Sequence, residues 1–105
     1  MDIKTIKTLI RKKKYLFSEH ADEERTKDTL SVKEVEEAIL CGEVIEERLD
    51  DSRGESRLVS GKSKSGKTIH IVIGLRFGKP VIVTNYLPSK KEWIYGKIRK
   101  SGKYE

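Results

Sequence analysis

The sequence predicts an α+β fold in which two or three N-terminal helices precede a four-stranded antiparallel meander sheet. Apolar residues recur at three- and four-residue intervals before Gly42 and at every second position after it. An S-x-x-E capping box at Ser31 and Glu34 marks a helix start shortly before that change of period. The connections between the extended segments are too short to hold a crossover helix, so neighbouring strands are expected to run antiparallel.

The helices are expected within residues 1–41. Apolar residues opposite a run of lysines predict a basic amphipathic helix over residues 1–17. Ser18 can cap a second short helix, and a third follows the capping box and ends at Gly42. These two helices fill residues 18–41.

The sheet is expected to span residues 43–86. Its four strands are predicted at residues 43–50, 57–61, 68–76 and 81–86. In the strongest of them, Ile69, Ile71 and Ile73 share one face and His70 lies on the other. Residues 87–105 form a C-terminal tail.

Composition limits the class of protein. With 105 residues, the chain has the length of a single domain spanning 1–105. It carries a net charge of +6, and 38% of its residues are charged. The sequence lacks an apolar run of the roughly 18 residues that a membrane helix needs. The single Cys41 cannot form an internal disulfide, which favours a cytoplasmic location.

Residues 61–68, GKSKSGKT, match the phosphate-binding pattern G-x-x-x-x-G-K-[ST]. A functional phosphate loop is followed by a helix whose N-terminal amides hold the phosphates. Here Thr68 begins the alternating run IHIVIGL, which is typical of a strand. We therefore interpret the match as the tip of a hairpin.

Basic residues are concentrated in the sheet and the tail, whereas the helical segment 18–41 is acidic. Such a distribution is typical of a surface that binds a polyanion. The candidate nucleic-acid-binding residues are Arg57, Lys62, Lys64, Lys67, Arg76 and Lys79. The alternative is that these side chains mainly keep the protein soluble.

His20 and Arg25 form the strongest candidate for a chemical site. RNA cleavage by attack of a 2′-hydroxyl requires a general base, a general acid and a cation for the charged phosphorane. On a helix, His20 shares a face with Glu24, and Arg25 lies on a neighbouring face. His70 is a second candidate imidazole. The sequence has no H-E-x-x-H or paired-cysteine spacing, so neither a metal nor a cofactor is expected.

Each candidate also has a structural interpretation. His20 can pair with Glu24 on an exposed helix face, and His70 can be a hydrogen-bonded core histidine. Arg25 can form an ion pair with Asp22 or Asp28, which contributes little when it is exposed.

The order of short motifs resembles a small family of domains of unknown function. The matching segments are F-S-x-H-A-x-x-E-R at 17–25, S-V-x-x-V-x-x-A-I at 31–39, G-E-V-I-E at 42–46, R-L-V at 57–59, H-I-V at 70–72 and T-x-Y-x-P at 84–88. That family is similar to the RelE/BrnT-type toxin ribonucleases, which place helices before a twisted four-stranded antiparallel sheet and act without metal. The resemblance implies His20 and Arg25 as site residues, supported by His70, Thr84 and Tyr86.

The leading hypothesis is therefore a RelE-like, metal-independent endoribonuclease that acts on RNA and has an antitoxin-like protein partner. In this hypothesis His20 is the general acid or base and Arg25 stabilises the phosphorane. One alternative is a non-catalytic module that binds nucleic acid or protein through the same surface. Another is an interaction protein whose acidic middle segment pairs with a basic partner.

Overall fold

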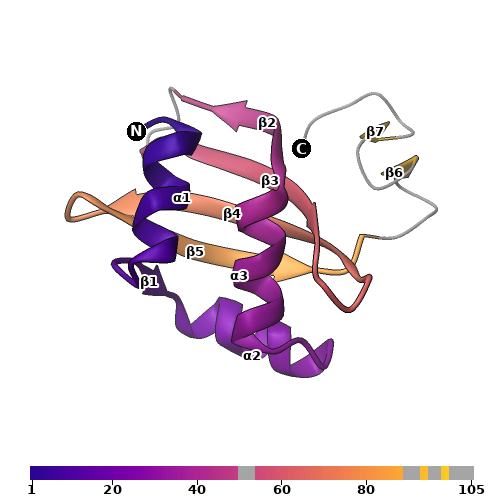
Figure 1. Ribbon diagram of the computed structural model, residues 1–105. Helices are drawn as coiled ribbons and strands as arrows, with labels where there is room; N and C mark the ends of the chain where they lie inside the picture. The colour runs from indigo at the N-terminus through magenta and orange to yellow at the C-terminus, as the bar shows by residue number, and fades with distance from the viewer. Residues whose placement is uncertain (50–53, 89–92, 95–97, 100–105) are drawn as a thin grey trace.

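The computed structural model describes residues 1–49, 54–88, 93–94 and 98–99 (Figure 1). The elements are α1 (Ile3–Arg11), β1 (Leu16–Phe17), α2 (Glu19–Lys27), α3 (Val32–Cys41), β2 (Glu43–Arg48), β3 (Ser56–Lys62), β4 (Thr68–Arg76), β5 (Lys79–Tyr86), β6 (Trp93–Ile94) and β7 (Ile98–Arg99). The α+β class is confirmed. Strand β4 has the predicted bounds, and the other predicted strands differ by one or two residues at their ends.

The main sheet has five strands in the order β1-β5-β4-β3-β2. Strands β2 to β5 form the predicted antiparallel meander. The sequence did not predict the fifth strand, β1, which lies parallel to β5 at the edge of this meander. Leu16 pairs with Val81 and Phe17 with Ile82, and the Ser18 amide donates to the Ile82 carbonyl at 3.0 Å. A two-residue strand is too short to show alternation in a sequence.

Helix α1 is shorter than predicted. The amphipathic pattern suggested a helix through residue 17, but α1 ends at Arg11. Lys13 adopts a left-handed conformation with φ of 61°, and the Lys14 amide donates to the Leu9 carbonyl at 2.8 Å. This is a Schellman ending, which usually uses glycine. The lysine run therefore ends the helix without the residue that marks such an ending in a sequence.

The predicted starts of the other two helices are confirmed. The Ser18 hydroxyl accepts a hydrogen bond from the Ala21 amide at 3.0 Å, which caps α2. Both halves of the capping box join Ser31 and Glu34 at 3.0 Å, and Gly42 ends α3 as expected.

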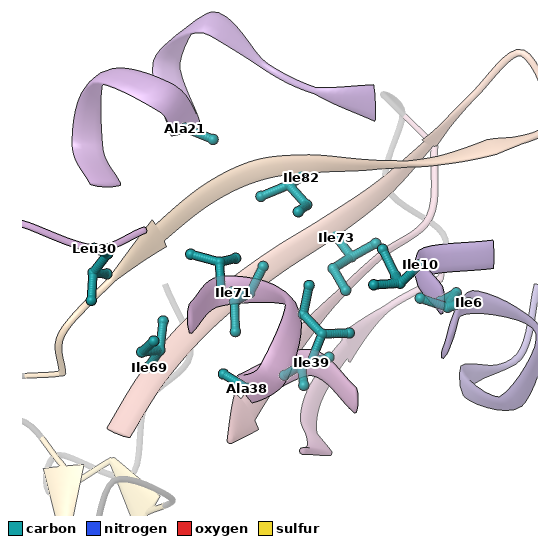
Figure 2. Packing of buried hydrophobic residues seen from close by; sticks show 12 residues of the cluster. Ile6, Ile10, Ala21, Leu30, Ala38, Ile39, Ile69, Ile71, Ile73 and Ile82 are labelled. Atoms are coloured by element: carbon teal, nitrogen blue, oxygen red, sulfur yellow. The ribbon is translucent and has the colours of Figure 1, made fainter. Parts of the chain in front are cut away.

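The core lies between the helices and one face of the sheet (Figure 2). Helices α1 and α3 lie side by side across this face, and α2 packs against β5. The predicted face of β4 is confirmed, since Ile69, Ile71 and Ile73 are all buried against the helices. Burial of each such side chain stabilises the fold by about 1.5–3 kcal/mol.

Helix α3 approaches strand β3 at backbone distance. A Cβ placed on Gly61 would lie 1.8 Å from the Ala38 carbonyl oxygen, and one on Gly42 would lie 2.5 Å from the same atom. Both clashes involve backbone, which cannot rotate away as a side chain can. Glycine at position 61 therefore sets the distance between helix and sheet.

The C-terminal part contains a small antiparallel pair, in which Trp93 lies opposite Arg99 and Ile94 opposite Ile98. The rest of the predicted tail, beyond residue 88, and most of the turn at 50–55 fall outside the described residues. Within the described ranges, no helix is long and apolar enough to span a membrane.

Candidate functional site

The sheet face opposite α1 and α3 carries charged and apolar side chains of the strands. Successive side chains of a strand alternate between faces, so the neighbours of the buried isoleucines face away from the helices. The register places Glu46 opposite Leu58 and Arg48 opposite Ser56 on this side. We call it the second face.

A hollow of about 430 Å³ lies on the second face and is formed by β2 to β5 and the residues before β3. The ionisable and phenolic residues that line it are Glu46, Arg48, Glu55, Arg57, Arg76 and Tyr86. Its apolar lining includes Leu58, Val72 and Val81. A volume of this size falls in the range of small-molecule binding sites.

Gly74 forms part of the lining of the hollow. It pairs with Ser56 on one side and Val81 on the other. A Cβ at this position would lie 3.3 Å from a Val83 methyl and 3.5 Å from a Val81 methyl. Because Gly74 has no side chain, the space next to Val81 and Val83 stays open and adds to the depth of the hollow.

Arg57 borders the hollow but is held by other contacts. It pairs with Ile73, so its side chain faces the helices rather than the second face. Its Nη1 lies 3.5 Å from Glu55 Oε1, and its side chain is only 11% exposed. The N-terminal ammonium of Met1 donates to the same carboxylate at 2.7 Å, and this bond lowers the pKa of Glu55. Arg57 therefore belongs to a structural ion cluster.

Tyr86 and His70 lie together on adjacent strands. The Tyr86 hydroxyl is 3.4 Å from His70 Nδ1, and the two rings meet edge to face with centroids 5.4 Å apart. His70 is completely buried, whereas Tyr86 is half-buried and lines the hollow. The phenol can therefore contact a ligand, while the buried imidazole beside it packs on the ring and lies within hydrogen-bonding distance of its hydroxyl.

The predicted pair on α2 is His20 and Arg25, and in the structure Arg25 is held by contacts within the fold. Arg25 donates to Asp22 at 2.9 Å and to the Leu30 carbonyl at 3.0 Å, and its guanidinium lies 6.0 Å from the Phe17 ring centroid. The structural interpretation of Arg25 as a partner of Asp22 is confirmed. Arg25 thereby joins the end of α2 to the start of α3.

His20 lies exposed on α2, whereas His70 is buried in the central strand β4. Glu24 was the predicted partner of His20, and its Oε1 lies 3.6 Å from Lys27 Nζ. The two histidines thus stand on different elements in different surroundings. A catalytic role for His20 stays a prediction.

Apart from Arg57, the predicted nucleic-acid-binding residues divide into two groups at opposite ends of the β3–β4 pair. Arg76 and Lys79 lie opposite each other at the β4–β5 turn. Lys62, Lys64 and Lys67 lie at the β3–β4 connection, at the other end of these strands. The sequence analysis predicts a single binding surface for these residues, but in the structure they do not form one continuous patch.

The interpretation of residues 61–68 as a hairpin tip is confirmed. The connection docks on the first turns of α3, where Ser65 Oγ donates to Glu34 Oε2 at 2.6 Å. Lys67 Nζ lies 3.2 Å from the same oxygen, and the Lys64 amide donates to Glu37 at 3.1 Å. These polar groups therefore bind α3 rather than a phosphate.

This docking predicts a pH-dependent contribution of Glu34 to stability. Hydrogen bonds from Ser65, the Ser31 amide and Lys67 lower the pKa of Glu34 from 4.5 to about 2. The ionised carboxylate stabilises the folded state, so its contribution is present above pH 4.5 and is lost as the pH falls towards 2. Urea unfolding should show a stability gap between the wild type and Glu34→Gln that shrinks below pH 4.5. The exposed Glu23→Gln serves as the control, and a gap that is equal at pH 3 and pH 7 contradicts the prediction.

The comparison with family models returns one match. The model described as a domain of unknown function, DUF4258, matches residues 17–86. The chain belongs to this family. The matched segment starts in β1 and ends at Tyr86, the last residue of β5, so the DUF4258 domain includes every strand that lines the hollow. No curated protein and no solved structure matches the chain.

Two residues of the DUF4258 domain, Glu46 and Arg48, line the hollow but were not among the sequence candidates. A β-bulge between Val44 and Glu46 shifts the register of β2 against β3. Without that extra residue, Ile45 would take the position of Glu46 on the second face. The one feature of the sequence that points to Glu46 and Arg48 is their spacing of two residues in a strand, which places both side chains on one face.

No group of three or more histidine, cysteine or acidic side chains within the described part of the DUF4258 domain could hold a metal ion. Besides Glu55 and Arg57 of the ion cluster, the hollow is lined by a carboxylate, two exposed guanidiniums and a phenol, from Glu46, Arg48, Arg76 and Tyr86. This set offers a proton acceptor, a proton donor and two permanently charged cations.

Proposed function

We propose that the protein is a metal-independent, toxin-like endoribonuclease whose RNA substrate binds in the hollow on the second face. The observation that carries this proposal is that Glu46, Arg48, Arg76 and Tyr86 all line one hollow, with Arg76 at the β4–β5 turn and Tyr86 at the far end of β5. Cleavage by the RNA's own 2′-hydroxyl requires a base, an acid and cations near one phosphate. The family that the sequence motifs resemble is similar to the RelE/BrnT-type toxins, and this similarity supports metal-independent RNA cleavage as the reaction.

The reaction follows from the groups present. Glu46 accepts the proton of the 2′-hydroxyl while its oxygen forms a bond to the adjacent phosphorus. Arg48 and Arg76 neutralise the charge of the phosphorane. The bond from phosphorus to the 5′ oxygen breaks, and Tyr86 gives its proton to that leaving oxygen. The products are a 2′,3′-cyclic phosphate and a 5′-hydroxyl.

His70 has a positioning role in this proposal. Its ring packs edge to face on Tyr86, and its Nδ1 lies 3.4 Å from the phenolic oxygen. Because His70 is buried, it acts on the substrate only through Tyr86. It fixes the orientation of the phenol. After turnover, Glu46 loses its proton to solvent and the half-buried Tyr86 regains one from solvent, which restores both groups.

The test of this function is cleavage of a labelled single-stranded RNA in the presence of EDTA. Arg48→Gln combined with Arg76→Gln is expected to lower the cleavage rate at least about tenfold, since hydrogen bonds to charged groups contribute about 1.5–3 kcal/mol each. Arg11→Gln is the control, because Arg11 is also exposed but lies at the end of α1, on the other side of the sheet. It should cleave at the wild-type rate.

Three outcomes oppose the proposal. Cleavage that EDTA abolishes means that a metal ion is required. RNA that binds without being cut favours the non-catalytic module. Loss of cleavage in His20→Ala, together with normal cleavage in the double arginine variant, moves the site to α2.

A further inference from the structure

Phe77 is the most exposed large apolar side chain among the described residues. It lies in the turn between β4 and β5, and it is 90% exposed. The next most exposed, Leu49, is 57% exposed. A phenyl ring in water gains no packing energy, so its presence at this tip is not explained by the core.

The backbone at the turn also disfavours phenylalanine. Phe77 and Gly78 both have positive φ values, 52° and 72°. Two-residue hairpin turns with this conformation favour Asn-Gly or Asp-Gly, since bulky residues are strained there. The two other non-glycine residues of the described chain with positive φ, Lys13 and Thr29, follow the ends of α1 and α2. Neither packing nor turn geometry therefore accounts for the ring.

Positive charge surrounds the ring. Arg76 precedes Phe77, and Lys79 lies opposite Arg76 in the β4–β5 pair. Both side chains are exposed, and Arg76 also lines the hollow. An exposed aromatic ring between two cations, next to a site for phosphate, has the chemistry of a platform for single-stranded nucleic acid. The ring stacks on a base while the cations contact the backbone.

We propose that Phe77 stacks on an unpaired base of the bound RNA, and that single-stranded RNA is the substrate class. This inference rests on the proposed function, because it requires the neighbouring phosphate to occupy the hollow. In an RNA duplex the bases are stacked on each other inside the helix, so their faces are unavailable to the ring. The side chain at this turn therefore selects single strands.

The test is a binding assay with two 2′-O-methyl RNA probes, a short single strand and a blunt duplex. The probes lack a free 2′-hydroxyl and are not cut by the proposed route. Phe77→Leu keeps the apolar character but removes the aromatic face, and it should bind the single strand about 5- to 100-fold more weakly. Phe77→Trp should bind within about twofold of the wild type, because it keeps a stacking surface. Binding of the duplex should be weaker than that of the single strand and should not change in either variant.

Phe77→Asn separates binding from folding. Asparagine suits the left-handed backbone at this position, so this variant should have a higher melting temperature than the wild type and a lower affinity for the single strand. A purely structural role for Phe77 predicts no loss of affinity.

The failures of the two proposals are distinguishable. If the wild type binds the single strand and the double arginine variant binds it more weakly, but Phe77→Leu binds like the wild type, the stacking inference is wrong and the hollow remains the RNA site. If the wild type binds neither probe, the proposed function itself is wrong.

Discussion

Replacing Gly61 with alanine is expected to destabilise the fold by about 3 kcal/mol or more, at the upper end of what overpacking costs. The added Cβ would lie 1.8 Å from the Ala38 carbonyl oxygen and 3.0 Å from the Gly42 Cα. All of these atoms are backbone, so relief requires α3 to move away from β3. That movement would open the packing of Ile39 against the sheet.

The measurement is urea unfolding of Gly61→Ala beside Gly74→Ala. Gly74→Ala is the control, because it makes the same substitution in β4, the strand adjacent to β3. Its new Cβ would meet the methyl groups of Val83 and Val81 at 3.3 and 3.5 Å, and these side chains can shift. Gly74→Ala should therefore cost about 1 kcal/mol or less. A Gly61→Ala variant as stable as Gly74→Ala would contradict the close approach of α3 and β3.

The sequence predicted those parts of the fold that local signals encode. The capping box at Ser31 and Glu34 fixes the start of α3 through two hydrogen bonds between neighbours in the chain. The alternation in β4 predicts its buried face, because burial follows a period of two. The end of α1 was missed, since Lys13 adopts a conformation that the sequence would mark with glycine. Strand β1 was missed because its partner, β5, lies far along the chain.

The candidate site was predicted in part. Arg76 and Tyr86 were selected from the sequence, and both line the hollow. Arg57 was placed among them, but its register with Ile73 directs it to the helices. Glu46 and Arg48 depend on one extra residue in β2, and nothing in a single sequence locates such a bulge. The sequence therefore identifies which residues can carry the chemistry, whereas the sheet face that each side chain occupies depends on strand register.

The fold also changes the meaning of the charge pattern. In the sequence, the acidic segment and the basic sheet are separate, but the β3–β4 connection brings them together. Lys67 pairs with Glu34, and the Lys64 amide binds Glu37. The charge of Lys67 is thus paired at this end, where the side chains of Lys62 and Lys64 stay exposed, and Arg48, Arg76 and Lys79 are exposed at the other end.

Replacing Tyr86 with phenylalanine is expected to slow RNA cleavage by about 1,000-fold, within the range that general acid–base groups contribute. The change removes only the hydroxyl, so the ring should still pack on His70 and the arginines should still hold the phosphate. The affinity for a non-cleavable RNA should therefore stay within about threefold of the wild type, since a single neutral hydrogen bond is worth about 0.5–1.5 kcal/mol. Single-turnover cleavage at saturating protein, measured beside the binding constant, separates the two effects.

Tyr15→Phe is the matched control for this experiment. The Tyr15 hydroxyl donates to the buried Glu36 at 2.5 Å, and α3 carries Glu36 on the helix side of the sheet. Loss of this bond should lower the stability by about 1.5–3 kcal/mol and leave the cleavage rate of the folded protein unchanged. If Tyr86→Phe cleaves RNA at the wild-type rate, the proton for the leaving oxygen comes from another group, and Tyr86 is not the general acid. If it loses RNA affinity as strongly as cleavage, the phenol holds the substrate in the ground state rather than serving the chemical step.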